Sequence, residues 1–233
     1  MSWRGVGAEF VGTVMFLVAI VGSGVVTSVG GPQSTQLFHH AVIVGAMLAA
    51  LILALGPISG AHFNPAVTFA DAALGGISKR LAGAYVLAQL VGAVVGVALA
   101  NFVFGHPIVQ VAEIERLGVP LVASEALATF GLLFVIFATV GSNSSGAVAA
   151  AAGTYITAAI FATPSTSFAN PAVTISRLLT PTWTGIAPNS VLPFLFGQAI
   201  GTVAAIVVTR FMLWPTRDEA RPAIQLQTEK GSP

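Results

Sequence analysis

The chain has 233 residues, of which 55% are hydrophobic and only 7% are charged. Because soluble domains carry about 25% charged residues, this composition excludes an ordinary water-soluble domain and indicates a surface that faces hydrocarbon. The formal net charge of +1 gives no reason to expect a nucleic acid or an acidic partner. The chain has no cysteine, which excludes disulfides, thiolate nucleophiles and thiol–metal sites.

Six apolar segments are long enough to cross a bilayer, which takes about 20 residues. In chain order they cover residues 7–28, 37–56, 81–104, 121–140, 147–163 and 191–213. The first contains Glu9 and has no small-residue cleavage site, so we interpret it as a span and not as a signal peptide. Two further apolar segments, residues 64–74 and 170–179, are too short to span. We expect an all-α membrane domain over residues 1–214 and a polar tail over 215–233.

The Lys and Arg residues are distributed unevenly between the two sides of the predicted membrane domain. With both termini on one side, seven of them fall there and only Arg116 and Arg177 fall on the other. Positive residues favour the cytoplasmic side. The sequence therefore predicts a multi-pass protein of the plasma (inner) membrane with both termini, and the tail, in the cytoplasm.

The two halves of the chain, residues 5–104 and 121–213, repeat each other. Asn-Pro-Ala-Val-Thr occurs at residues 64–68 and again at 170–174, and Glu9 in the first span is matched by Glu125 in the fourth. Three spans per half is an odd number, so the second half must lie inverted in the bilayer. Inverted repeats with short, interrupted apolar segments indicate a site at the membrane midplane.

Small residues also recur at matching places in the third and sixth spans. Gly92 and Gly96 in one span, and Gly197 and Gly201 in the other, are spaced four residues apart. This spacing allows two helices to approach closely. We expect these glycines to be packing sites.

Each Asn-Pro pair predicts the start of a short helix, because Asn is a favoured N-cap and Pro a favoured first helical residue. The residues concerned are Asn64, Pro65 and Ala66, and Asn170, Pro171 and Ala172. A helix that begins at mid-depth leaves non-helical backbone before it, which a membrane tolerates only where it lines protein or water. We expect pore-lining backbone at Gly60, Ala61, His62, Phe63, Phe168 and Ala169.

The two half-helices predict the electrostatic character of the midplane. Each helix N-terminus presents about half a positive charge. The Asn64 and Asn170 amides add hydrogen-bond donors, and the preceding carbonyls add acceptors. A neutral solute can exchange hydrogen bonds there, whereas a proton or metal cation meets two positive helix ends. The arrangement favours water and small uncharged solutes.

These motifs resemble those of the major intrinsic protein family, the aquaporins and aquaglyceroporins, over about residues 5–213. The resemblance implies six tilted spans, two re-entrant half-helices, one pore per subunit and a homotetramer in the lipid bilayer. It also implies that His62 gives its carbonyl to the pore and its ring to the scaffold. No catalytic group, metal site or cofactor is expected, and the four scattered histidines are not typical of a metal site.

Glu9 and Glu125 would be costly in hydrocarbon, so we expect them to face the bundle interior. There each carboxylate can hold the backbone of a pore loop in place. The alternative is a position near the lipid headgroups, since both residues lie close to the start of their spans.

The positions that form the outer constriction in most relatives are unusual in this sequence. That constriction combines an aromatic residue of the second span with an Arg three residues after the second Asn. The matching residues here are Val44, Ser167 and Val173, with Ala159 in the fifth span if Pro164 is aligned with the usual Pro. A loop difference of one residue would replace Ala159 by Ala158 or Ile160.

Two valines in place of a ring and a guanidinium predict a wider, less polar filter without a fixed positive charge. The alternative is that Phe38, Phe161 or Phe168 narrows the pore instead. Arg177 lies one helical turn beyond Val173, and we expect it to reach the outer membrane interface. His39 and His40, at the start of the second span, are also expected at that interface.

Val173 resembles the residue found in a bacterial subgroup associated with arsenic-resistance operons. The predicted function is a passive, aquaglyceroporin-like channel that conducts arsenite, methylated arsenicals or glycerol-type solutes as well as water. The alternatives are an ordinary water channel, an ion-coupled secondary transporter, which uses similar broken helices, and a junction protein with a closed pore. Because the predicted midplane lacks a chain of acidic residues and histidines, a proton-coupled transporter is less favoured.

Overall fold

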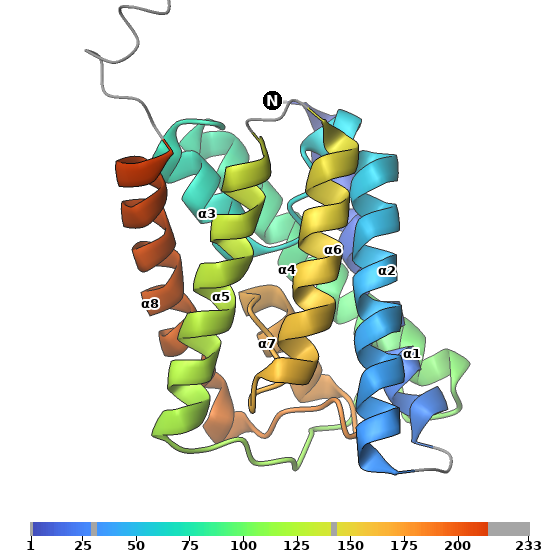
Figure 1. The fold of residues 1–233 in the computed structure, drawn as a ribbon. Helices are drawn as coiled ribbons and strands as arrows, with labels where there is room; N and C mark the ends of the chain where they lie inside the picture. Colours follow the sequence, from blue (N-terminus) through green and yellow to red (C-terminus); the bar gives the residue numbers. More distant parts are fainter. Residues whose placement is uncertain (1, 29–31, 141–143, 214–233) are drawn as a thin grey trace, which may run out of the picture.

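The computed structural model describes residues 2–28, 32–140 and 144–213 (Figure 1). The expected tail at 215–233 lies outside these residues. The described part is helical, as predicted, with six long helices and two short ones. The long helices are α1 (Trp3–Thr27), α2 (Gln33–Ser59), α4 (Lys79–Val103), α5 (Val119–Val140), α6 (Ser145–Ala162) and α8 (Pro188–Met212). The short ones are α3 (Pro65–Leu74) and α7 (Pro171–Ser176), which continues as a 3₁₀ turn over Arg177–Leu179.

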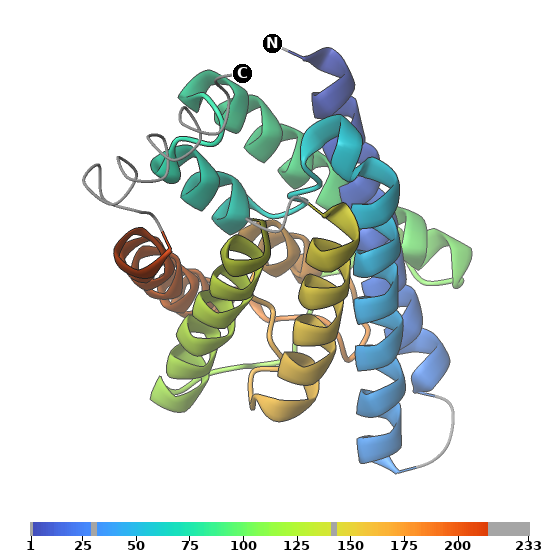
Figure 2. The ribbon, with the colours of Figure 1, turned by 45° about the horizontal axis from the view of Figure 1, so that its top comes forward.

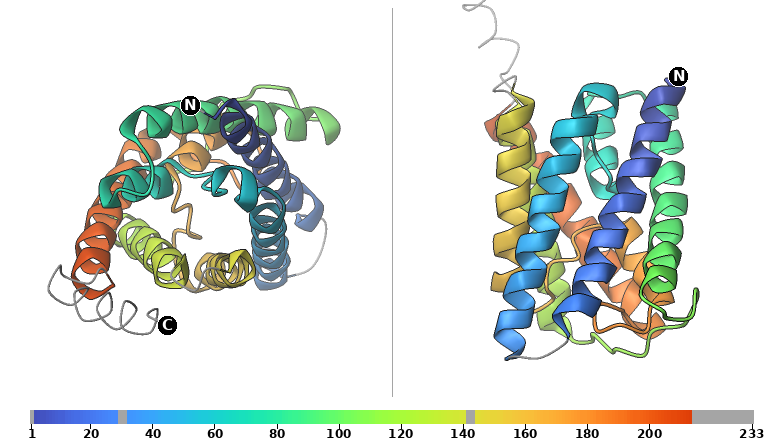
Figure 3. Two further views of the ribbon diagram at one scale, coloured as in Figure 1. Left: turned by 90° about the horizontal axis from the view of Figure 1, so that it is seen from above. Right: turned by 90° about the vertical axis from the view of Figure 1, so that its right-hand side faces the viewer.

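The long helices form a bundle that surrounds the two short ones (Figure 3). Within the described residues, α1, α2, α4, α5 and α8 are long and apolar enough to cross a membrane. Helix α6 has 18 residues and packs alongside α2 and α5. A span needs about 17–25 residues, so α6 is at the short end of that range.

The packing of the helices follows the inverted repeat. Helix α1 packs against α2 and α4, and in the second half α5 packs against α6 and α8 in the same way. The contact between α2 and α6 joins the halves, and each short helix crosses over, with α3 against α8 and α7 against α4. Figure 2 shows α3 beside α4 and α8, the two long helices that it mainly contacts.

Both ends of the described chain lie at the same end of the bundle, at the top of Figure 1. We call the opposite end, where α2 begins and α6 finishes, the distal end. Helix α7 runs from the centre of the bundle toward it. An even number of long helices brings the two ends of the described chain to the same end of the bundle.

The repeated glycines are packing sites, which confirms the sequence prediction. A Cβ atom on Gly96 would lie 2.6 Å from the Val14 carbonyl oxygen of α1, which is closer than real contacts allow. In the second half, a Cβ on Gly201 would collide with the Ala126 carbonyl oxygen of α5. The glycines one turn earlier on each helix make equivalent contacts. The missing side chains therefore bring α4 onto α1 and α8 onto α5.

Candidate functional site

The two Asn residues cap the short helices. Asn64 Oδ1 accepts a hydrogen bond from Ala66 N at 2.8 Å, and Asn170 Oδ1 accepts from Ala172 N at 2.9 Å. Proline follows each cap at the first helical position, where its missing N–H costs nothing. Local sequence preference therefore starts both helices in the middle of the bundle.

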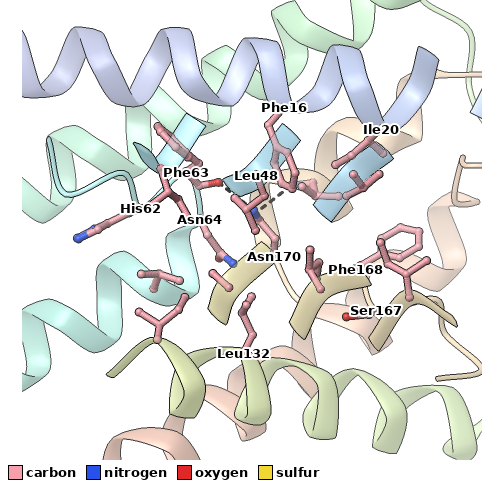
Figure 4. A pocket seen from close by; sticks show the side chains of 18 of the residues that line it. Phe16, Ile20, Leu48, His62, Phe63, Asn64, Leu132, Ser167, Phe168 and Asn170 are labelled. Atoms are coloured by element: carbon pink, nitrogen blue, oxygen red, sulfur yellow. Dashed lines mark hydrogen bonds between the residues drawn. The ribbon is translucent and has the colours of Figure 1, made fainter. Parts of the chain in front are cut away.

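The same two side chains also join the halves of the molecule. Asn64 Nδ2 donates to the Ala169 carbonyl at 2.8 Å. Asn170 Nδ2 donates to the Phe63 carbonyl at 2.9 Å (Figure 4). A primary amide has two N–H groups, so each Asn keeps a second donor. Both side chains line the same cavity. The centre of the bundle thus presents donors from both repeats to one path.

The backbone before each short helix is strained. Ala61 and Phe63 have φ values of 53° and 48°, and Ser167 and Ala169 have values of 47° and 46°. Left-handed φ costs a non-glycine residue of order 1–3 kcal/mol. Equivalent residues of the two repeats carry the strain, and the surrounding structure must hold it.

Glu9 holds the first loop. Its Oε1 accepts from Ser59 Oγ at 2.6 Å and His62 N at 2.9 Å, and its Oε2 accepts from Phe63 N at 2.7 Å and Gln89 Nε2 at 2.8 Å. The carboxylate is fully buried. Because two of its donors are backbone N–H groups of the strained loop, its charge stabilises that loop directly.

Glu125 has the equivalent contacts in the second repeat. Phe168 N and Ala169 N each donate to it at 2.9 Å, and Gln198 Nε2 donates at 2.7 Å. Gln198 also donates to Thr174 Oγ1 at 2.7 Å, so the hydrogen bonds connect α7 to α8 and, through Glu125, to α5. Glu125, like Glu9, is fully buried. Neither glutamate therefore lies near the lipid headgroups, which was the alternative position.

The His62 ring contacts the first short helix. Its Nδ1 lies 3.1 Å from Thr68 Oγ1, and its Nε2 lies 3.5 Å from Asp71 Oδ2. The ring also packs edge-on against Tyr85, with centroids 5.6 Å apart. Among the described residues, no group of three or more His, Cys, Asp or Glu side chains could hold a metal ion.

A cavity runs past both Asn side chains and along the inner face of the bundle (Figure 4). Three of the four residues predicted for the filter, Val44, Ser167 and Val173, line it. The fourth predicted residue, Ala159, is not among the residues that line the cavity; α6 contributes Ala152, Ile156 and Ile160, the last of which is one of the two alternatives that a loop difference allows. Successive residues of an α-helix point about 100° apart around its axis. A shift of one residue therefore turns the larger Ile160 side chain toward the cavity in place of Ala159.

The aromatic candidates for narrowing the pore separate into two groups. Phe38 and Phe161 are 53% and 51% exposed and pack against each other, away from the cavity. Phe168 lines the cavity and is buried. Its ring packs edge-on against Phe194, with centroids 5.1 Å apart, so Phe168 is held in place.

The prediction that Arg177 reaches the outer interface is wrong. Arg177 is 3% exposed and lines the cavity. Its Nε donates to the Thr184 carbonyl, and its guanidinium carbon lies 3.5 Å from the centroid of the Phe168 ring. Because the chain after α7 folds back over the short helix, Arg177 has no path to the membrane surface. The distal part of the cavity is therefore not free of charge.

His40 is also buried rather than interfacial, at 3% exposure, and lines the same cavity. Its Nδ1 lies 2.8 Å from Ser23 Oγ, and its ring packs edge-on against Trp183 at 4.9 Å. The spacing of four residues to Val44 places both on one face of α2. The same spacing relates Arg177 to Val173, so helical periodicity was the signal that could have identified both residues.

A second hollow lies next to the cavity, at the distal end. It is lined by Arg116, Trp183 and others, and shares Thr166 with the cavity. Arg116 Nε and its terminal Nη2 donate to the Gly185 and Trp183 carbonyls at 3.1 and 2.9 Å. Burial lowers the pKa of Arg116 to about 10, so this side chain remains positive at neutral pH.

The open space in the cavity is narrow. About 40 Å³ is open to the centres of water-sized molecules, and one water needs about 10–15 Å³ by this measure. This is room for a short file of waters. Ile160 and Phe168 are two of the large side chains that line the cavity.

A cavity inside a bundle of six long helices, with two capped half-helices at its centre, is typical of a transmembrane channel of the aquaporin type. Comparison with known proteins gives the family. The major intrinsic protein family model matches residues 1–163. The chain belongs to this family, whose members are membrane channels for water and small solutes and not enzymes.

Individual relatives place the chain within the family. It is 39% identical over 227 residues to Aquaglyceroporin AqpS of Rhizobium meliloti, which covers 97% of this chain and 95% of that protein. It is 30% identical to human Aquaporin-5, over 91% of this chain and 82% of the relative. The X-ray structure of the aquaglyceroporin from Plasmodium falciparum shares the fold, with a TM-score of 0.75 at 20% identity over 92% of this chain and 98% of that one.

Proposed function

We propose that this protein is a passive channel for small uncharged solutes, with the solute range of an aquaglyceroporin. Glycerol-type solutes, arsenite and methylated arsenicals are the proposed cargo, together with water. The supporting observation is the pair Val44 and Val173, which makes one level of the cavity apolar where most relatives carry a ring and a guanidinium. Similarity over almost the full length to a relative named Aquaglyceroporin AqpS supports the same range.

The chemistry of the lining suits these solutes. Arsenite is a neutral hydroxide near neutral pH, so it can exchange hydrogen bonds with the Asn64 and Asn170 amides. Methyl groups on an arsenical or a carbon skeleton can pass Val44 and Val173 without losing hydrogen bonds there. The absence of cysteine from the chain removes thiols that would trap trivalent arsenic.

The channel is proposed to act as a homotetramer in the plasma (inner) membrane, with both termini in the cytoplasm and the distal end outside. Arg116 and Arg177, the two positive residues assigned to the outer side, lie toward the distal end, and both ends of the described chain lie at the other end, which supports this orientation. Native mass spectrometry of the detergent-solubilised protein checks the number of subunits. Protease accessibility of a tag at either terminus, in intact and opened cells, checks the orientation.

Uptake into proteoliposomes tests the function. The purified protein should accelerate swelling in glycerol and the entry of arsenite and monomethylarsenite, without any imposed ion gradient. Empty liposomes give the background rate. Uptake that requires a proton or sodium gradient would show a coupled transporter. Water permeability with no solute uptake would show an ordinary water channel, the alternative that the small volume of the cavity favours.

A further inference from the structure

His40 and Arg177 lie one helical turn distal to the apolar pair Val44 and Val173. Neither is among the positions that form the outer constriction in most relatives. His40 precedes Val44 by one turn of α2, and Arg177 follows Val173 by one turn. Both are 3% exposed, and both line the cavity. A buried guanidinium is expensive unless it is paired or fully hydrogen-bonded, so its position requires an explanation.

The guanidinium of Arg177 is only partly satisfied by the protein. Its Nε donates to the Thr184 carbonyl, but one terminal nitrogen, Nη2, is buried without a partner. The only ion pair among the described residues joins His62 to Asp71, so Arg177 is not neutralised by direct contact. Ser167 Oγ, which lines the same cavity, is likewise buried without a partner.

His40 supplies a complementary acceptor. His40 Nδ1 lies 2.8 Å from Ser23 Oγ, and the Ser23 hydroxyl lies 3.1 Å from the Ile20 carbonyl, to which it can donate. In the tautomer that carries its proton on Nδ1, His40 donates to Ser23 Oγ. In the neutral ring, Nε2 is then the unprotonated nitrogen and an acceptor. His40 and Arg177 therefore offer one acceptor and one set of donors to the same path.

The segment that follows α7 holds these side chains in position. The Thr184 carbonyl binds Arg177, the neighbouring Trp183 ring packs on His40, and the Trp183 carbonyl binds Arg116. Phe168 lies beneath both guanidiniums, at 3.5 Å from Arg177 and 5.1 Å from Arg116. The polar level is therefore built from fixed parts and not from mobile surface side chains.

We propose that His40 and Arg177 form a second selectivity filter, one turn distal to Val44 and Val173. In this filter the free Arg177 nitrogen donates to an oxygen of an uncharged hydroxylated solute, and His40 Nε2 accepts from its hydroxyl. The charge of Arg177 opposes cations, including the proton. The inference deepens the proposed channel function and rests on it: Val173 sets the apolar passage, whereas Arg177 supplies the positive charge.

The test compares Arg177→Gln and Arg177→Lys with wild type and with Arg210→Gln in proteoliposomes. Arg210 is exposed at the end of α8 and serves as the matched control. A unit charge about 10 Å from a cation, at an effective dielectric constant of about 20, changes its population about tenfold. We expect Arg177→Gln to raise proton leak, measured with an enclosed pH dye, at least about fivefold. Arg177→Lys and Arg210→Gln should stay near wild type.

Osmotic water permeability of each variant shows that the protein is folded and open. If Arg177→Gln conducts water and its proton leak equals that of wild type, the charge does not contribute to exclusion and the inference is wrong. A wild type that passes water but neither glycerol nor arsenite would refute the proposed solute range, while the comparison of proton leaks remains readable.

A structure determined in glycerol gives a second, independent answer if Arg177→Gln does not fold. We expect an ordered oxygen within about 3.2 Å of both the Arg177 guanidinium and His40 Nε2. Ordered oxygens at Asn64 and Asn170 with none at Arg177 would overturn the solute-binding role.

Discussion

The Glu9 carboxylate offers the clearest quantitative test of how the pore loop is held. In Glu9→Gln one carboxylate oxygen becomes an NH₂ group, so two of the four donors that now bind Glu9 lose their acceptor and face another donor. If the amide takes the place of Oε2, these are Phe63 N and Gln89 Nε2. A buried donor left without a partner costs about 1–3 kcal/mol, so the substitution should destabilise the fold by about 2–6 kcal/mol.

For a chain of this length, about 1 kcal/mol corresponds to roughly 2–4 °C in melting temperature. Glu9→Gln should therefore lower the midpoint of thermal unfolding in detergent, followed by circular dichroism, by at least about 4 °C. Osmotic water permeability should fall as well, because Ala61 and Phe63 lose the group that holds their left-handed backbone. Glu113→Gln, at an exposed loop position, is the matched control and should melt like wild type. A Glu9→Gln protein with wild-type melting and permeability would show that the loop is held by other contacts.

Three further changes test the pore and the packing. Val173→Arg adds a second guanidinium beside the cavity and should lower glycerol and monomethylarsenite uptake at least about tenfold while water still passes. Unchanged uptake would mean that Val173 does not limit the size of the solutes that pass. Ile160→Ala removes bulk from the lining and should raise glycerol uptake relative to water, and an unaltered ratio would place the narrowest point elsewhere. Gly201→Leu forces a side chain into the Ala126 carbonyl and should abolish the folded, monodisperse protein in size-exclusion chromatography. Gly7→Ala, where a Cβ meets nothing within 4 Å, is its control and should behave as wild type.

The sequence predicted the helices because apolar length and capping chemistry are local properties. The structure extends several of them beyond the apolar segments: α2 begins at Gln33 instead of residue 37 and ends at Ser59 instead of residue 56. Apolarity marks the part of a helix that lies in hydrocarbon, whereas caps and turns mark where the helix ends. The half-helix starts at Asn64 and Asn170 were predicted to the residue, because an Asn-Pro pair specifies the cap and the first helical position together.

The lining of the pore was only partly predictable. Val44, Ser167 and Val173 follow by counting from the two motifs. The α6 position was predicted only to within one residue, because a loop separates α6 from the second motif and the loop length sets which face of α6 turns inward; Ile160, and not Ala159, lines the cavity. Local sequence could not show this, since a shift of one residue replaces Ala159 by Ile160.

Arg177 was missed for a different physical reason. Its position on α7 was known from the sequence, but its environment is set by residues 180–187, which fold back and present the Thr184 carbonyl. A long side chain near a helix end extends to the membrane surface only when nothing covers it. Whether a later loop covers it is a non-local property of the fold.

The crossed bonds between the halves have a consequence for biosynthesis. The Asn64 amide binds the Ala169 carbonyl, 105 residues later in the chain, and α3 packs against α8, the last helix of the described residues. During synthesis the first half can insert its long helices and bind its own loop through Glu9. The first short helix can pack against α4 of its own half, but its contacts with α5, α7 and α8 form only after the second half has been made. Assembly of the centre of the pore therefore waits for the second repeat.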